Sequence, residues 1–253
     1  IKVAGKIIKY NDTRLMPLDT EKMIKDIYQL ANNRDFSNFL ASGDDDFSFS
    51  LPNIGRFRVN AYRQRNSCAA VLRIVRFELP DPKKMHIPEI VCDLANQKKG
   101  MILVTGPAGS GKSTTLACII DQINQKRNTH IITIEDPIEY LHSHNKSIVS
   151  QREVFHDTKN YVAALKAALR EAPEVILVGE MRDLETIDIA ITAAETGHLI
   201  FSSLHTVGAA NTIDRMIDVF PASQQQQIRV QLAMVLNAVI CQQLLPGVDG
   251  KMI

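Results

Sequence analysis

A glycine-rich segment near the middle of the chain has the residue types and spacing that hold the phosphates of a nucleotide. Residues 106–115 read GPAGSGKSTT, fit the pattern G-x-x-x-x-G-K-[ST], and follow a short apolar run that ends at Thr105. Glycines let backbone N–H groups wrap phosphates, and a helix beginning near Lys112 would add partial positive charge. In this pattern the lysine reaches the β- and γ-phosphates of ATP, and the Ser113 hydroxyl ligates Mg²⁺. A glycine-rich turn without a ligand is the alternative, and the strand–loop–helix order disfavours it. The predicted ATP-binding residues are Gly106, Pro107, Ala108, Gly109, Ser110, Gly111, Lys112, Ser113 and Thr114.

A carboxylate at the end of a second apolar run supplies the other half of such a site. Residues 175–180 read VILVGE, so this run ends in Glu180. The carboxyl ends of parallel strands share one edge of a sheet, so Glu180 should face the glycine-rich segment. There it can hold the shell of the Mg²⁺ ion, or orient and deprotonate the attacking water as the catalytic base. The alternative is an acid at a helix N-terminus that the helix dipole stabilises.

Residues 131–139 read IITIEDPIE and bring three carboxylates within five residues. Such crowding is costly unless a cation or solvent is close. We expect Glu135 to point inward, because it still belongs to the strand that Pro137 ends, and we assign it to the γ-phosphate site. Solvated loop acids are the alternative.

Two histidines bracket another apolar run, residues 199–204. A regular strand of this length would put His198 and His205 roughly 23 Å apart, so both cannot touch one phosphate. His205 follows the run and should lie at the same edge as the glycine-rich segment, which makes it the predicted γ-phosphate sensor. His198 is equally well explained as a structural histidine.

The elements that position these residues alternate, from Gly100 onward, between short apolar strands and periodic helices. This order is typical of an α/β fold in which the strands are buried on both faces of a mostly parallel sheet. We expect the strands Met101–Thr105, Ile131–Glu135, Val175–Gly179 and Leu199–Leu204, a helix over Ile87–Asn96, and a long final helix over Ala222–Leu245.

The first 77 residues have a mixed pattern that predicts a smaller α+β domain. Pro80 and Pro82 indicate a linker over residues 78–86, and residues 87–253 form the α/β domain. Arginines 56, 58, 63 and 65 crowd one predicted hairpin, either as charges that keep a strand edge soluble or as phosphate ligands. The expected elements are a strand over Ile1–Tyr10, a helix over Asp19–Asn32, a hairpin of Asp44–Leu51 and Ile54–Ala61, and a strand over Ala69–Val75.

Composition narrows the function classes. Apolar residues make up 45% of the 253 residues, enough for a large core. Basic and acidic residues number 29 and 28, so charge gives no case for a nucleic-acid partner. We find no run of eighteen apolar residues, no secretion leader, and no CxxC pair that would indicate zinc or a redox site.

Together these segments resemble the secretion ATPase superfamily of type II secretion and type IV pili, from the start of the chain to Leu245. No single one of the matching segments is highly specific, but together they are. Besides the glycine-rich loop, they are GRFRVN (55–60), IEDPIE (134–139), QREV (151–154), LVGEMRD (177–183), AAETG (193–197) and GHLIFSSLHT (197–206).

This resemblance implies a PAS-like amino-terminal domain and a RecA-like P-loop motor domain that uses ATP and Mg²⁺. It also implies a homohexamer in the cytoplasm, at the inner-membrane face, that reaches the membrane only through partners such as a pilus platform protein. In the superfamily, arginines of the small domain help to bind the nucleotide phosphates. Matching by motif, Arg58 and Arg73 are the candidates in this chain.

Within the superfamily the likeness favours members that retract pili. Assembly and secretion members carry a tetracysteine zinc module after the segment equivalent to residues 238–244, whereas residues 245–251 here contain no cysteine pair. One departure from the retraction members is Ala172, which replaces an aspartate and precedes the strand that leads to Glu180, so it should not impair catalysis. An assembly or secretion ATPase is the first alternative, and a nucleotide-binding switch with weak hydrolysis is an alternative of another class.

Overall fold

A computed structural model describes residues 1–3, 6–52, 54–75 and 79–245. The chain divides into two compact units, Ile1–Val75 and Arg76–Ile253, each with its own hydrophobic core. The boundary predicted at residue 77 lies close to this division. Residue 78, at the start of the predicted linker, and residues 246–253, where the sequence lacks a cysteine pair, lie outside the described residues.

The larger unit is built on a parallel sheet. Within the described part of the chain this sheet has six strands in the order β11-β6-β10-β9-β7-β8, and every neighbouring pair is parallel. This arrangement confirms the predicted α/β class. The strands are β6 (Gly100–Thr105), β7 (His130–Glu135), β8 (Ile148–Glu153), β9 (Val175–Val178), β10 (Leu199–Leu204) and β11 (Leu236–Cys241).

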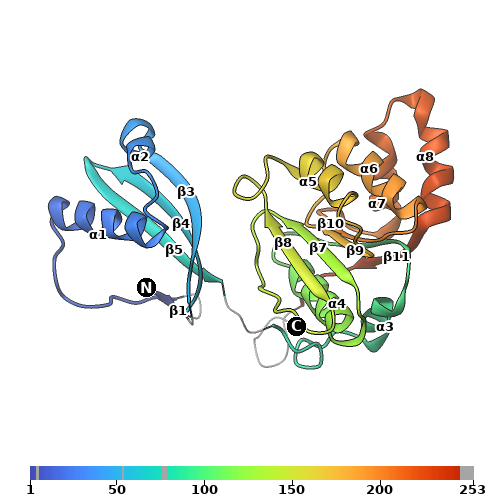
Figure 1. The fold of residues 1–253 in the computed structure, drawn as a ribbon, viewed down its shortest axis with the longest axis horizontal. Coiled ribbons are helices and arrows are strands. Elements are labelled where there is room, and N and C mark those ends of the chain that lie inside the picture. Colours follow the sequence, from blue (N-terminus) through green and yellow to red (C-terminus); the bar gives the residue numbers. More distant parts are fainter. Residues whose placement is uncertain (4–5, 53, 76–78, 246–253) are drawn as a thin grey trace. The chain divides into compact units, whose positions relative to one another are not determined.

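Helices cover both faces of this sheet (Figure 1). In β6, Met101 and Leu103 join the core on one face, while Ile102 and Val104 join the core on the other. Because neighbouring strand residues point to opposite faces, both sets must be apolar, which explains the unbroken apolar runs in the sequence. One face packs on α4 (Lys112–Lys126), with α3 (Glu89–Asp93) and η1 (Leu94–Asn96) beside it, and the other packs on α5 (Tyr161–Ala168), α6 (Leu184–Glu195), α7 (Ala209–Asp218) and α8 (Ala222–Val235).

Two strands of the sheet differ from the prediction. The prediction of one helix over Ala222–Leu245 is wrong at its end. The helix α8 ends at Val235, and Leu236–Cys241 forms β11, an edge strand beside β6. The apolar residues of this segment suit a strand as well as a helix, and pairing with β6 decides between them. The other edge strand, β8, reads IVSQRE, and its polar residues gave no strand signal.

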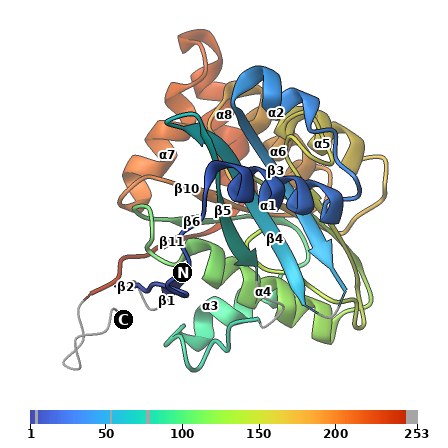
Figure 2. The ribbon, with the colours of Figure 1, turned by 90° about the vertical axis from the view of Figure 1, so that its left-hand side faces the viewer.

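The smaller unit is an antiparallel meander of β3 (Asp44–Leu51), β4 (Gly55–Gln64) and β5 (Ser67–Val75). The helix α1 (Pro17–Leu30) lies across one face of it, and α2 (Ser37–Ser42) precedes β3 (Figure 2). The predicted single strand over Ile1–Tyr10 is wrong: within it, β1 (Lys2–Val3) and β2 (Lys6–Ile7) pair with each other. The core of this unit includes Tyr28, Phe39, Phe47, Val59 and Ala61.

None of the described helices has both the length and the apolar character needed to cross a bilayer.

Candidate active site

The glycine-rich loop joins the end of β6 to the start of α4, as predicted. Gly111 is the residue before the helix and has a φ of +86°, a left-handed conformation that favours glycine. Gly106 is required for a different reason, because a Cβ atom there would lie 2.1 Å from the carbonyl oxygen of Gln242. The Ser110 hydroxyl is buried and has no hydrogen-bond partner among the described residues. The loop therefore has the backbone conformation of a phosphate-binding loop, and its buried Ser110 hydroxyl could bind a ligand.

The ammonium group of Lys112 is buried and folded back onto this loop. It donates to the carbonyl oxygens of Gly106 at 2.9 Å and Pro107 at 3.0 Å, and it lies 3.5 Å from Nδ1 of His205. Burial lowers the pKa of Lys112, while the nearby carboxylates of Glu139 and Glu180 act in the opposite direction. A phosphate at the loop would give this cation a charged partner that main-chain carbonyls do not provide.

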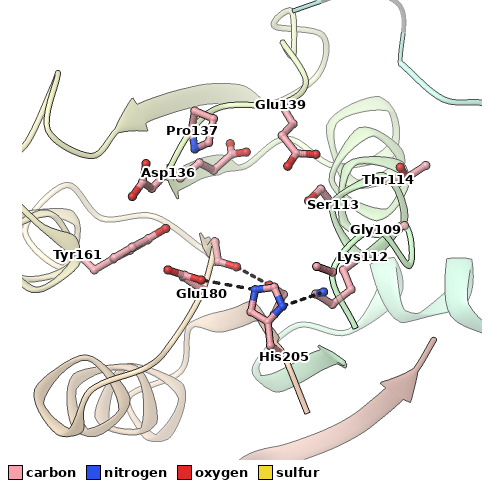
Figure 3. Close-up of a pocket in the computed structure, with 15 residues that line it drawn as sticks. Gly109, Lys112, Ser113, Thr114, Asp136, Pro137, Glu139, Tyr161, Glu180 and His205 are labelled. Carbon is pink, nitrogen blue, oxygen red and sulfur yellow. Dashed lines mark hydrogen bonds and ion pairs between the residues drawn. The ribbon is translucent and has the colours of Figure 1, made fainter. Parts of the chain in front are cut away.

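A cavity of about 420 Å³ brings most of the predicted site together (Figure 3). Of the predicted residues, Gly106, Pro107 and Ser110 belong to the same loop but do not line the cavity, and Arg58 and Arg73 lie in the smaller unit. The predicted residues that line it are Ala108, Gly109, Gly111, Lys112, Ser113, Thr114, Glu135, Glu180 and His205.

Glu180 follows β9 and lies at the same sheet edge as the loop, as its position in the sequence predicted. One carboxylate oxygen accepts from Nη2 of Arg182 at 2.7 Å and lies 3.7 Å from Nε2 of His205. Burial and the neighbouring Lys112 lower the pKa of His205. His205 therefore bridges Lys112 and Glu180, one contact from each ring nitrogen.

Glu135 points inward, and its side chain is already engaged. One of its oxygens accepts from the Thr133 hydroxyl at 2.7 Å and from Nε2 of Gln151 at 3.3 Å. Burial raises the pKa of Glu135 to about 7, and these hydrogen bonds oppose the shift.

His198 lies away from this site, at the other end of β10. Its Nδ1 is 2.9 Å from the carbonyl oxygen of Ala193 and 3.3 Å from the Thr196 hydroxyl. These contacts fit the structural alternative given for His198 above.

Sequence reasoning missed several residues that line the cavity. Glu139 points toward Ser113 and Thr114, and Tyr161 points toward Glu180 from the start of α5 (Figure 3). Burial raises the pKa of Tyr161. Glu139 did carry a signal, as the last of three crowded carboxylates, whereas nothing around Tyr161 in the sequence indicated a role. Asp136, Pro137, Gly179 and Ser203 also line the cavity.

Arg58 and Arg73 face each other across β4 and β5. With Asp46, Asn60 and Val71 they line a cavity of about 280 Å³ in the smaller unit. Their role as phosphate ligands stays a prediction.

The oxygen donors of the main cavity suit Mg²⁺. The described residues contain no cluster of three or more His, Cys, Asp or Glu side chains that could enclose a metal ion. Mg²⁺ does not need such a cluster, because it keeps several waters and binds through one or two protein oxygens together with substrate phosphates. The Ser113 hydroxyl and the Glu180 and Glu139 carboxylates line the same cavity, so the residues present fit the ion.

Comparison with known proteins gives a consistent family assignment. The model of the type II/IV secretion system protein family matches residues 29–251. The chain is 46% identical to the type IV pilus retractation ATPase PilT of Pseudomonas aeruginosa, over 99% of this chain and 72% of that protein. It is also 46% identical to the twitching motility protein of Neisseria gonorrhoeae, over 99% of this chain and 66% of that protein.

A solved structure shares the fold closely. The crystal structure of the pilus retraction motor PilT with bound ADP aligns with a TM-score of 0.93 and 50% identity, over all of this chain and 73% of that chain.

Proposed function

The chain belongs to the type II/IV secretion system protein family, and we propose that it is an ATP-hydrolysing motor that powers the retraction of type IV pili. The observation that carries this proposal is the meeting of the glycine-rich loop, Glu180 and His205 at one cavity of the larger unit. Relatives named as pilus retraction and twitching motility proteins, similar along nearly the whole chain, support the direction of work.

Lys112 is the principal phosphate ligand in this proposal. Its ammonium exchanges the carbonyl oxygens of the loop for the β- and γ-phosphates of ATP, and backbone N–H groups of residues 106–114 complete the cradle. A Mg²⁺ ion held by the Ser113 hydroxyl would neutralise charge that develops on the phosphates.

Glu180 is the proposed base, which orients the attacking water and takes its proton. His205 lies between Lys112 and Glu180, and so can couple the presence of the γ-phosphate at Lys112 to the position of the base, Glu180. Glu135 lines the same cavity as a partly buried carboxyl group, and burial raises its pKa. Glu139 is a second candidate for the base, since its carboxylate also lines the cavity and Arg182 already engages Glu180.

The proposed assembly is a homohexamer at the cytoplasmic face of the inner membrane, working on a pilus platform protein. Arg58 and Arg73 are proposed to contribute to phosphate binding from a PAS-like smaller unit. The resemblance of the sequence segments given above to the secretion ATPase superfamily supports both the assembly and the role of the two arginines.

ATP turnover by the full-length protein tests the enzymatic part of the proposal. Lys112→Ala should abolish turnover, because the phosphates lose their main cationic ligand. Lys126→Ala, at the opposite end of the same helix, is the matched control and should turn over ATP like the wild type. A wild-type protein that binds ATP and never hydrolyses it would favour the alternative of a nucleotide-binding switch.

A further inference from the structure

The strand β8 contains the segment QREV, whose role the proposed mechanism leaves open. Strand residues alternate between faces, so Gln151 and Glu153 project to one side and Arg152 to the other. Gln151 and Glu153 meet the loop that follows β7. Arg152 instead contacts Glu171, with Nη1 3.7 Å from a carboxylate oxygen, and donates to the carbonyl oxygen of Asp157.

Gln151 uses both ends of its amide group to hold the loop. Its Nε2 donates to the carbonyl oxygen of Tyr140 at 2.9 Å, and its Oε1 accepts from the backbone N–H of His142 at 2.8 Å. The same Nε2 lies 3.3 Å from the Glu135 carboxylate. One side chain of an edge strand thus satisfies two backbone groups of the loop and touches a carboxylate of the site.

Glu153 holds the loop one step earlier. It is only 2% exposed, and its carboxylate accepts from the backbone N–H of Ile138 at 3.1 Å. The other carboxylate oxygen lies 3.4 Å from Nε2 of His156. Burying a carboxylate costs several kcal/mol unless its partners compensate, so its hydrogen bond to this loop is part of what makes the burial tolerable.

These contacts flank Glu139. Ile138 and Tyr140 are its two neighbours in the chain, and each is held by a different β8 side chain. The Tyr140 hydroxyl also lies 2.9 Å from the Thr114 hydroxyl in the first turn of α4. The backbone of Glu139 is therefore fixed relative to both the sheet and the phosphate-binding helix.

We propose that Gln151 and Glu153 are positioning residues, which hold the loop on both sides of Glu139 and so keep its carboxylate in the nucleotide cavity. The proposal rests on the ATPase function proposed above. Hydrolysis depends on geometry at the reacting atoms, and a displacement of about 1 Å can cost about a hundredfold in rate.

The test compares steady-state ATP turnover of full-length variants. Gln151→Leu removes the amide contacts at similar volume and should lower kcat by about ten- to a hundredfold with little change in KM, because the phosphate ligands are untouched. Glu153→Ala should act in the same way, while Glu153→Gln should keep most of the wild-type kcat, since its amide oxygen still accepts from Ile138. Arg152→Gln, on the opposite face of β8, is the matched control and should match the wild type.

Hydrogen exchange at the backbone amides provides a second readout that does not depend on turnover. The amide of His142 should exchange faster in Gln151→Leu, and that of Ile138 faster in Glu153→Ala, with neither changed in Arg152→Gln. If Gln151→Leu does not fold, Gln151→Asn is the substitute, because its shorter side chain cannot span both loop contacts.

The possible failures can be told apart. Wild-type kcat in both Gln151→Leu and Glu153→Ala would overturn the positioning role and leave the ATPase proposal standing. A fall in kcat that Glu153→Gln shares fully with Glu153→Ala would overturn the role of the Ile138 contact. A wild-type protein without any turnover would overturn both proposals.

Discussion

At the scale of single residues, Lys112 shows how a buried cation can be kept available for an anion. It donates to two main-chain carbonyls and lies 3.5 Å from Nδ1 of His205, while the carboxylates of Glu139 and Glu180 act on it only from a distance. Carbonyl partners satisfy the ammonium group without neutralising it. Hydrogen bonds between two charged groups are stronger, so a phosphate can displace the carbonyls with a gain in stability.

Two of the carboxylates that line the cavity, Glu180 and Glu139, can be distinguished by matched substitutions. Glu180→Gln should retain ATP binding and lose turnover by about a hundredfold or more, because an amide cannot accept the proton of the attacking water. Glu139→Gln makes the same change on another wall of the cavity and should lose less. Single-turnover hydrolysis, together with a separate measurement of ATP affinity, checks both variants.

A larger loss in Glu139→Gln would transfer the role of base to Glu139. Wild-type turnover in Glu180→Gln would show that the assignment of Glu180 is wrong.

Site residues that belong to a fixed local sequence pattern could be predicted from the sequence. Site residues that only the tertiary fold brings to the cavity could not. The glycine-rich loop positions Lys112 and Ser113 through local backbone form, and Glu180 and His205 follow from the shared edge of parallel strands. Tyr161 enters the cavity only because α5 packs beside β7 and β9, a contact that no local spacing encodes. The inward turn of Glu139 depends on loop contacts made from β8.

At the scale of elements, the central strands were predictable because both of their faces are buried. The edge strands were not, because an edge position relaxes the demand for apolar residues. In β8, Ile148 is exposed, and the polar residues Gln151 and Glu153 serve the neighbouring loop. In β11, apolar residues at helical spacing continued the pattern of α8, and only pairing with β6 reveals the strand.

The segment after β11 lies against the glycine-rich loop, and this contact leads to a prediction about stability. In Gly106→Ala the new Cβ would lie 2.1 Å from the carbonyl oxygen of Gln242, so the loop or the end of β11 must shift. We expect a loss of about 1–3 kcal/mol in the free energy of unfolding from this overpacking, in addition to backbone strain at a φ of +148°. Denaturant titration of the nucleotide-free protein measures the loss.

Gly109→Ala is the control for strain alone. Gly109 also has a positive φ, +78°, but nothing lies within 4 Å of its Cβ position, so we expect a cost of about 1–2 kcal/mol. Equal losses in the two variants would show that the contact with Gln242 yields without cost.

At the scale of the whole molecule, each unit has its own hydrophobic core. The larger unit holds the nucleotide cavity, while the smaller unit carries Arg58 and Arg73 on a three-stranded meander. A motor needs parts that can adopt more than one arrangement, and two units on one chain can do so. Ligand binding shifts the balance between two arrangements only if the ligand interacts differently with each arrangement. The proposed phosphate contacts of Arg58 and Arg73 would supply that difference, since ADP lacks the γ-phosphate.

The direction of the work is the last property that can be tested at this scale. Hydrolysis alone is compatible with pilus retraction, pilus assembly or secretion, so the site chemistry does not decide between them. The similarity to a retraction ATPase and a twitching motility protein along 99% of this chain favours retraction.

A strain that lacks the protein should therefore keep surface pili, often in excess, and lose retraction when single pili are followed by microscopy. Wild-type protein should restore retraction, whereas Lys112→Ala should not, because retraction without ATP turnover has no source of work. Loss of surface pili in the deletion strain would instead identify an assembly motor, and unchanged pili with unchanged retraction would place the work in another secretion system.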